Sequence, residues 1–172
     1  DLVEKFMKKN GGLEWFMDQK NSYKDFIKKS KFDPGFMAKN LYSCIKDLAY
    51  QISTDCLNIN KPTLEEYFEE RLNMSHIIKG CFGSGDYIIV TPYCLYVIDW
   101  KFGRVPVAPD STQLILYMSG AYDKYILRNK AGRLVKKSPY PLLKRVCTVI
   151  VQPAVKSTPS FNYFTVKQLE KY

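Results

Sequence analysis

The stretch that decides the fold is Gly83–Lys101, with the sequence GSGDYIIVTPYCLYVIDWK. It holds two runs rich in β-branched and aromatic residues on either side of a short turn that contains proline, and this pattern predicts a β-hairpin. If Val90 pairs with Leu95 across the turn, each step back along the first strand matches a step forward along the second. The register therefore places Asp86 opposite Asp99.

A divalent metal ion is the expected partner of these two aspartates. Directly paired residues share a sheet face and side chains alternate along a strand, so Asp86, Asp99 and Lys101 point the same way. Opposed like charges destabilise a sheet unless a cation lies between them. Because hard carboxylate oxygens suit Mg²⁺ or Mn²⁺, the pattern predicts a metal site at Asp86 and Asp99.

The same three residues suit hydrolysis of a phosphodiester. That reaction needs a metal ion to polarise the phosphate, an activated water, and positive charge where the transition state gathers negative charge. Near two carboxylates the ammonium form of Lys101 is favoured, so we expect it to stabilise charge or position water rather than to act as a general base. The competing interpretation of Asp99 and Lys101 alone is an exposed ion pair at the end of a strand.

A helix is expected over residues 113–127, and two of its polar side chains are candidates for the same site. Gln113 and Tyr117 are four residues apart and therefore share one helix face. A carboxamide and a phenol on that face can hold a nucleic-acid backbone or the lysine. Tyr117 could equally be a core aromatic residue beside an apolar stripe.

The composition indicates one folded domain. The chain has 172 residues, 46% of them hydrophobic, which suffices for a substantial core. No stretch approaches about 20 continuous apolar residues and no leader opens the chain, so we expect a cytoplasmic protein without a membrane partner. The five cysteines are widely spaced and are expected to be reduced thiols, and the sole histidine, His76, is expected to be structural or exposed.

The order of elements predicts an α/β fold with a mixed central β-sheet flanked by helices. Apolar spacing predicts two short amphipathic helices over residues 1–32, broken by Gly11–Gly12, and a longer helix from Asp33 to Ile52. Strands are expected at residues 67–74, 87–90, 95–101 and 145–152, and a closing helix at residues 166–172. The predicted division is an N-terminal helical segment, residues 1–34, followed by the core, residues 35–172.

The charge balance predicts an anionic partner such as DNA. Lys and Arg outnumber Asp and Glu by 26 to 17, which gives a net charge of +9. A solvated helical face is the competing interpretation of the many lysines in the first forty residues. The candidate DNA-binding residues lie in a basic loop between residues 129 and 140: Lys130, Arg133, Lys136 and Lys137.

Three ordered motifs resemble those of the RecB-like branch of the PD-(D/E)XK nuclease superfamily. Gly83–Asp86 looks like its Gly-x-x-Asp motif, Asp99–Lys101 like its Asp-x-Lys motif, and Gln113–Tyr117 like its Gln-x-x-x-Tyr motif. The sequence around Ile98–Gly103 and Val149–Pro153 is similar to that of a bacteriophage and prophage group of the branch. The likeness extends to the end of the chain from about residue 35.

The resemblance implies a restriction-endonuclease-like core and DNA cleavage that depends on Mg²⁺ or Mn²⁺. It implies an exonuclease or a recombination and genome-processing enzyme of phage origin, which acts in the bacterial host cytoplasm with phage recombination proteins as partners. It also implies that Asp86 and Asp99 bind the metal with the carbonyl of Trp100, and that Lys101 is catalytic. Two adjacent glutamates, Glu69 and Glu70, lie on the first strand, and the resemblance favours Glu69 as a further metal ligand. The alternative is that both side chains are solvated.

One departure from the family pattern leaves other functions open. RecB-like nucleases commonly add a histidine from an upstream helix as a metal ligand, and no histidine precedes His76. Either that ligand belongs to a missing segment, or the metal binds more weakly, or the domain binds DNA without cutting it. The second hypothesis is therefore an inactive DNA-binding or assembly module on the same scaffold, and the third is an α/β interaction domain in which the motifs are accidental.

Overall fold

The computed structural model describes residues 2–56 and 64–169 and has an α/β fold built on a five-stranded sheet. The strands lie side by side in chain order: β1 (Glu65–Asn73), β2 (Phe82–Val90), β3 (Cys94–Trp100), β4 (Arg145–Val151) and β5 (Ser160–Thr165). The helices are α1 (Leu2–Asn10), α2 (Glu14–Met17), α3 (Tyr23–Ser30), α4 (Phe36–Asp55), α5 (Thr112–Tyr122), the π-helical turn η1 (Asp123–Leu127) and α6 (Val166–Leu169).

Strands β2 and β3 form the predicted hairpin in the predicted register. Val90 pairs with Leu95, and the ladder continues to Tyr87 opposite Ile98. β1 pairs antiparallel with the other edge of β2, β3 and β4 are parallel, and β5 is antiparallel to β4. A parallel pair requires a long crossover, and here that crossover contains α5. The prediction of a mixed sheet flanked by helices is confirmed.

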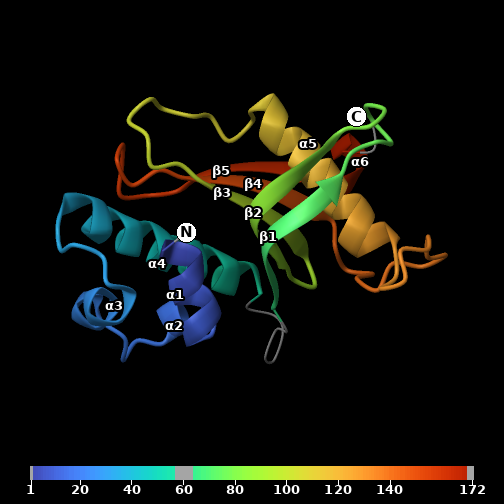
Figure 1. The fold of residues 1–172 in the computed structure, drawn as a ribbon. Helices are drawn as coiled ribbons and strands as arrows, with labels where there is room; N and C mark the ends of the chain where they lie inside the picture. The colour runs from blue at the N-terminus through green and yellow to red at the C-terminus, as the bar shows by residue number, and fades with distance from the viewer. Residues whose placement is uncertain (1, 57–63, 170–172) are drawn as a thin grey trace.

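Helices cover both faces of the sheet (Figure 1). α4 and the N-terminal helices lie against one face, and α5 crosses the other. β3 contributes to both cores by alternation: Tyr96 and Ile98 point to the α4 side, whereas Leu95 and Val97 point to the α5 side. Every residue of β3 is buried, so the end of this strand carries Asp99 into the interior.

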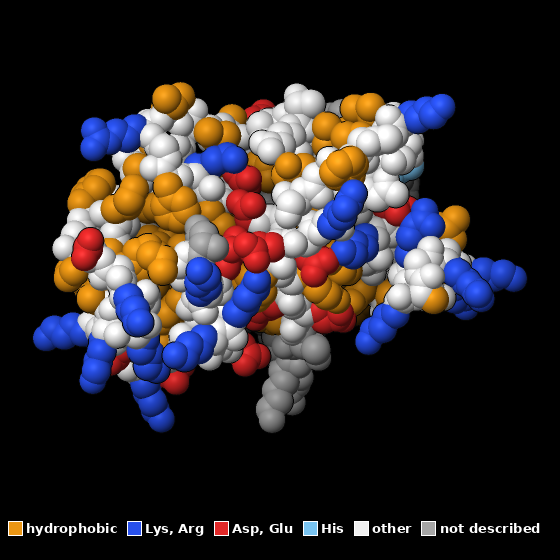
Figure 2. All heavy atoms as spheres, viewed as in Figure 1, with side chains coloured by type: hydrophobic (Ala, Val, Ile, Leu, Met, Phe, Trp, Pro, Cys, Tyr) orange, Lys and Arg blue, Asp and Glu red, His pale blue; other side chains and the backbone are white. Residues whose placement is uncertain are grey.

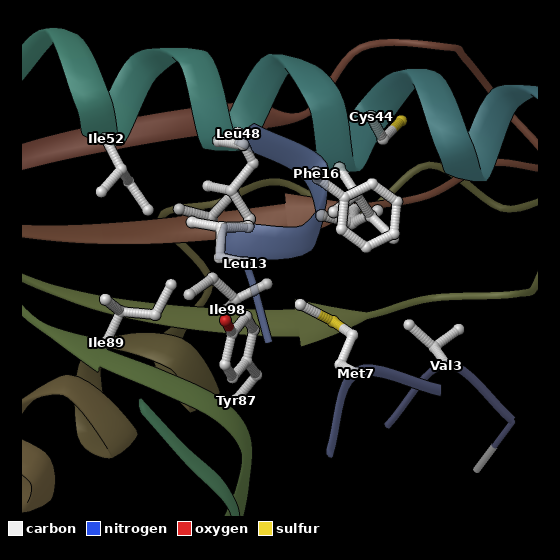
Figure 3. Close-up of a cluster of buried hydrophobic side chains, with 14 of the residues drawn as sticks. Val3, Met7, Leu13, Phe16, Cys44, Leu48, Ile52, Tyr87, Ile89 and Ile98 are labelled. Atoms are coloured by element: carbon white, nitrogen blue, oxygen red, sulfur yellow. The ribbon is translucent and has the colours of Figure 1, made fainter. Parts of the chain in front are cut away.

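The core on the α4 side joins the N-terminal segment to the sheet. In Figure 3, Leu48 and Ile52 point from α4 toward the sheet residues Ile89 and Ile98, and Leu13 lies in the same cluster. None of these five side chains is exposed. The N-terminal helices therefore share one core with the sheet, and the division of the chain at residue 34 stays a prediction.

The prediction of two helices over residues 1–32 was wrong, because the described residues 2–32 contain three. α2 ends at Met17, and α3 starts at a capping box in which the Asp25 amide donates to Ser22 Oγ and the Ser22 amide donates to Asp25 Oδ2. This capping box begins a new helix at a place where the apolar spacing alone predicts one continuous helix. The helix predicted over residues 113–127 is also divided, since it becomes π-helical at Asp123.

The strand predictions were incomplete in two places. β2 begins at Phe82 rather than at Tyr87, because residues 82–85 pair with β1. β5 was missed: it is an edge strand whose side chains are half-buried or exposed, so no apolar run indicates it. The closing helix is present as α6, and residues 170–172 of that prediction lie outside the described residues.

Two predictions from composition can be compared with the structure directly. The five cysteines are free thiols, as predicted. Over residues 2–56 and 64–169, no helix has both the length and the apolar content to cross a membrane.

Glu66 of β1 fastens the N-terminal segment to the sheet. Its carboxylate accepts a hydrogen bond from the Leu13 amide at 3.0 Å and another from the Tyr87 hydroxyl. Gly12 permits this approach, because its φ is +62° and a Cβ atom there would lie 2.1 Å from Glu66 Oε2. A side chain at residue 12 would therefore meet both backbone strain and a collision with a half-buried carboxylate.

We expect Gly12→Ala to lower the free energy of unfolding by at least about 2 kcal/mol, since it combines left-handed strain with displacement of Glu66. Gly11→Ala is the matched control, because Gly11 also has a positive φ but has open space where the Cβ would lie. It is expected to cost about 1 kcal/mol. Urea denaturation followed by circular dichroism measures both values, and equal losses would contradict the role given to Glu66.

Candidate active site

Asp99 is a buried carboxylate at the end of the central strand β3. It is 5% exposed, and alternation with Leu95 and Val97 places it on the α5 side of the sheet. Lys101 follows on the same side, and its Nζ lies 2.8 Å from Asp99 Oδ2. This ion pair balances the charge, but its geometry gives Oδ2 no hydrogen bond. Lys101 is therefore the one polar partner of Asp99 Oδ2 among the described residues, and a carboxylate oxygen with a single partner has capacity for a further ligand such as a cation.

Asp86 reaches the same place from β2. One step beyond the last ladder pair of β2 and β3, the Trp100 amide donates a hydrogen bond to Asp86 Oδ2 at 3.1 Å. Burial raises the pKa of Asp86, and the charge of Asp99 raises it further, against the opposing effects of the Trp100 amide and of Lys101. The structure therefore brings the two predicted aspartates and the lysine together, close enough for each charge to affect the others.

Glu69 lies beside Asp86 in an irregular part of β1. The ladder between β1 and β2 skips it, and its φ is +55°, a conformation that costs free energy for a residue with a side chain. Its charge contributes to the raised pKa of Asp86. Its carboxylate also accepts a hydrogen bond from Lys8 Nζ at 3.0 Å and shares another with Glu4. Lys8 and Glu4 were not predicted as site residues, because no local sequence pattern connects α1 to β1.

The oxygen ligands at this place fit a metal ion whose coordination the substrate would complete. Asp86 and Asp99 supply carboxylate oxygens, the Trp100 carbonyl follows Asp99 directly, and Asp99 Oδ2 has Lys101 as its one partner among the described residues. In the described ranges, no group of three or more His, Cys, Asp or Glu side chains is arranged to hold a metal ion. Mg²⁺ commonly binds one or two protein carboxylates together with phosphate and water, so two aspartates are a sufficient protein contribution. Glu69 is engaged by α1 and is not part of this minimal set.

Gln113 and Tyr117 contact each other at the start of α5. Gln113 Nε2 donates a hydrogen bond to Tyr117 Oη at 3.0 Å. The Tyr117 ring lies against Gly83 of β2, where a Cβ atom would be 2.4 Å from the ring carbon Cε1. Among the described residues, no hydrogen bond or ion pair joins this pair to the aspartates or the lysine. Gly83 thus sets how closely the helix approaches the strand that carries Asp86.

Gln152, which was not predicted as a site residue, fixes the segment that follows Lys101. Its buried carboxamide donates to the carbonyls of Gly103 at 2.8 Å and Val105 at 2.7 Å, and it accepts from the Val107 amide at 3.1 Å. One side chain therefore satisfies three backbone groups of this segment. The available signal was a single carboxamide directly after the apolar run Val149–Val151 of β4.

The predicted DNA-binding side chains lie on the loop after η1. The four basic residues are exposed: Lys130, Arg133, Lys136 and Lys137. The loop turns around Asn129, whose Oδ1 accepts hydrogen bonds from the amides of Ala131 and Arg133 at 3.0 Å. In Figure 2, basic side chains gather at the loop end of this face and over the N-terminal helices, and acidic side chains lie between them in front of β1 and β2.

A protein-family model matches residues 13–172 of the chain. The protein belongs to the DUF2800 family. That family is described as one of unknown function, so membership assigns no activity to the site. No curated protein matches the chain. The match to the DUF2800 family begins after α1, so it includes both aspartates and Lys101 but excludes Glu4 and Lys8.

The raised pKa of Asp86 predicts how the stability of this DUF2800 protein depends on pH. Ionisation of Asp86 is disfavoured in the folded state. The protonated Asp86 carboxyl therefore makes its full favourable contribution to the free energy of unfolding below a pH of about 4, and this contribution is lost as pH rises through the folded-state pKa. Asp86→Asn keeps an oxygen for the Trp100 amide and cannot ionise. We expect the variant to be more stable than the wild type at pH 7.5 and to lose that advantage near pH 4.

Chemical denaturation at the two pH values measures this difference. Asp110→Asn, at an exposed aspartate, is the matched control and should follow the wild type at both. A variant of Asp86 that is less stable than the wild type by the same amount at both pH values would contradict the electrostatic account.

Proposed function

We propose that this protein is a metal-dependent DNA nuclease built on a RecB-like PD-(D/E)XK core. The observation that supports the proposal is the group of Asp99, Asp86 and Lys101: a buried carboxylate whose Oδ2 has Lys101 as its one partner among the described residues, next to a second aspartate whose pKa its charge raises. The order of elements supports it too, because the hairpin is followed by α5 and then by a parallel strand, β4. A bacterial host cytoplasm and recombination proteins as partners belong to the same proposal.

In this proposal each residue has a distinct role. Asp86 and Asp99 hold a Mg²⁺ or Mn²⁺ ion, which when bound polarises the scissile phosphate and activates water. The Lys101 side chain is 31% exposed, so its ammonium extends from Asp99 toward solvent and can stabilise charge on the phosphate or position the attacking water. Gln113 and Tyr117, on α5, orient the DNA strand, and the basic loop contacts the DNA backbone.

A second candidate function is DNA binding without cleavage. It is favoured by the engagement of Glu69 with Lys8, which leaves two protein carboxylates for the metal, and by the net charge of +9. The two functions differ in turnover and not in affinity, so an assay of binding alone cannot separate them.

We expect the protein to degrade labelled linear duplex or single-stranded DNA when Mg²⁺ or Mn²⁺ is present. Asp86→Ala, Asp99→Ala and Lys101→Ala should each lower the rate by at least about 100-fold, because each removes a metal ligand or the transition-state cation. Gel analysis of the products over time gives the rates, with Asp110→Ala as the control.

Circular dichroism must show that each variant is folded before its rate is interpreted. Cleavage that survives Asp99→Ala or Lys101→Ala would overturn the proposal. Salt-dependent DNA binding by the wild type without any turnover would instead support the second function.

A further inference from the structure

Gln152 is the neighbour of Lys101 across the sheet. In the parallel ladder of β3 and β4, Trp100 pairs with Val151, and the Lys101 amide donates to the Val151 carbonyl at 2.9 Å. The next position in this register places Gln152 beside Lys101. Alternation with Ile150 places the Gln152 side chain on the α5 side of the sheet, which is the face of the two aspartates.

The ladder ends at this point, and the Gln152 side chain takes over from it. Pro153 has no amide proton, so β4 cannot donate the next backbone hydrogen bond of the parallel pattern. The Gln152 carboxamide instead donates to the carbonyls of Gly103 and Val105 and accepts from the Val107 amide. Among the standard side chains, only glutamine and the shorter asparagine offer two N–H donors together with a carbonyl acceptor.

The segment that Gln152 holds runs along the α5 side of β4. Residues 103–109 belong to the connection from β3 to α5 (Figure 1), and Val107 packs against the core on the α5 side. Further along, the Pro109 carbonyl accepts a hydrogen bond from Thr148 Oγ1. Thr148 precedes Gln152 by four residues and therefore shares its face. The segment thus lies over β4, next to the strand that carries Asp99.

The backbone of Lys101 lies between two fixed points. Its own amide is bound to β4, and the carbonyl of Gly103, two residues later, is bound to Gln152. The direction of the Lys101 side chain, whose Nζ lies 2.8 Å from Asp99 Oδ2, depends on this backbone. A displaced segment would therefore move the ammonium relative to the carboxylates.

We propose that Gln152 is a positioning residue of the candidate active site, which holds residues 103–107 so that Lys101 meets the scissile phosphate beside Asp99. The inference rests on the proposed function, since its effect is on the rate of DNA cleavage. The Gln152 residue is 3% exposed, so it acts through the segment and Lys101 and does not itself contact DNA. A misplacement of about 1 Å at a catalytic group can lower a rate by about 100-fold.

The test is the pH dependence of cleavage by Gln152→Glu, measured as kcat and KM for a labelled oligonucleotide in Mg²⁺. At pH 8.5 the new carboxylate has no N–H donor and repels both carbonyls, so kcat should fall by at least about 10-fold with KM unchanged. Burial raises the pKa of this carboxyl, and at pH 6 its protonated form again donates one hydrogen bond and accepts another. The ratio of its kcat to that of the wild type should therefore rise by at least about 3-fold between pH 8.5 and pH 6.

Comparison with the wild type at each pH corrects for the other titrations. Both proteins share the ionisable groups of the segments around residue 152: Asp99 and Lys101 at the end of β3, Arg104 in the held segment, and Lys156 after β4. Gln168→Glu, at an exposed position of α6, is the matched control, and its ratio should not change with pH. Gln152→Asn keeps both donors on a shorter side chain, so it should retain more kcat at pH 8.5 than Gln152→Glu and show a ratio independent of pH.

The outcomes separate this inference from the nuclease proposal. A folded Gln152→Glu variant whose kcat equals that of the wild type, or whose ratio stays constant with pH, would overturn the positioning role and leave the nuclease unaffected. If circular dichroism shows this variant unfolded at pH 8.5, Gln152→Asn decides: a folded protein with lowered kcat supports the role, and an unchanged kcat overturns it. A wild type that does not cleave DNA would overturn both proposals.

Discussion

Burial of Asp99 at the end of β3 is the constraint on which the rest of the site depends. A carboxylate removed from water needs compensation, and here it obtains one cation, Lys101, but no hydrogen bond to Oδ2. The second aspartate makes the balance worse rather than better, because the charge of Asp99 raises the pKa of Asp86, which burial already raises. An arrangement that costs stability in the free protein can persist when binding a ligand relieves it.

The surroundings hold this arrangement from several directions. Lys101 continues the β3 backbone, where its amide donates to the Val151 carbonyl of β4, and Gln152 secures the segment that follows. Gly83 lets α5 approach the strand that carries Asp86. The N-terminal helices add Lys8 on the remaining side. The backbone and the packing of neighbouring residues thus position the charged groups of Asp86, Asp99 and Lys101. These three side chains do not themselves have to support the fold.

The features that sequence predicts well are the ones that depend on local periodicity. Alternation over residues 83–101 was enough to predict the hairpin register, and the apolar face of α4 was evident from its spacing. Register in turn predicted that Asp86 and Asp99 share a face. The contact between Gln113 and Tyr117 followed from helical spacing in the same way.

What could not be predicted depends on contacts between distant segments. Nothing near Glu69 in the sequence indicates that Lys8 binds it, since the residues are 61 positions apart. Gln152 binds backbone groups 45 to 49 positions earlier in the chain, and the strand β5 has too little apolar character to be recognised without its partner β4. The start of β2 was predicted at Tyr87, because Gly83–Gly85 has no apolar side chains, but pairing with β1 makes these residues part of the strand.

The most direct measurement of the central claim is anomalous X-ray diffraction from crystals soaked in Mn²⁺. The account predicts one manganese peak between the carboxylates of Asp86 and Asp99, within about 2.0 to 2.4 Å of an oxygen from each. It also predicts that Lys101 Nζ moves away from Asp99 Oδ2, because the metal then takes that oxygen. Crystals that hold manganese only elsewhere, with the contact between Lys101 and Asp99 unchanged, would contradict it.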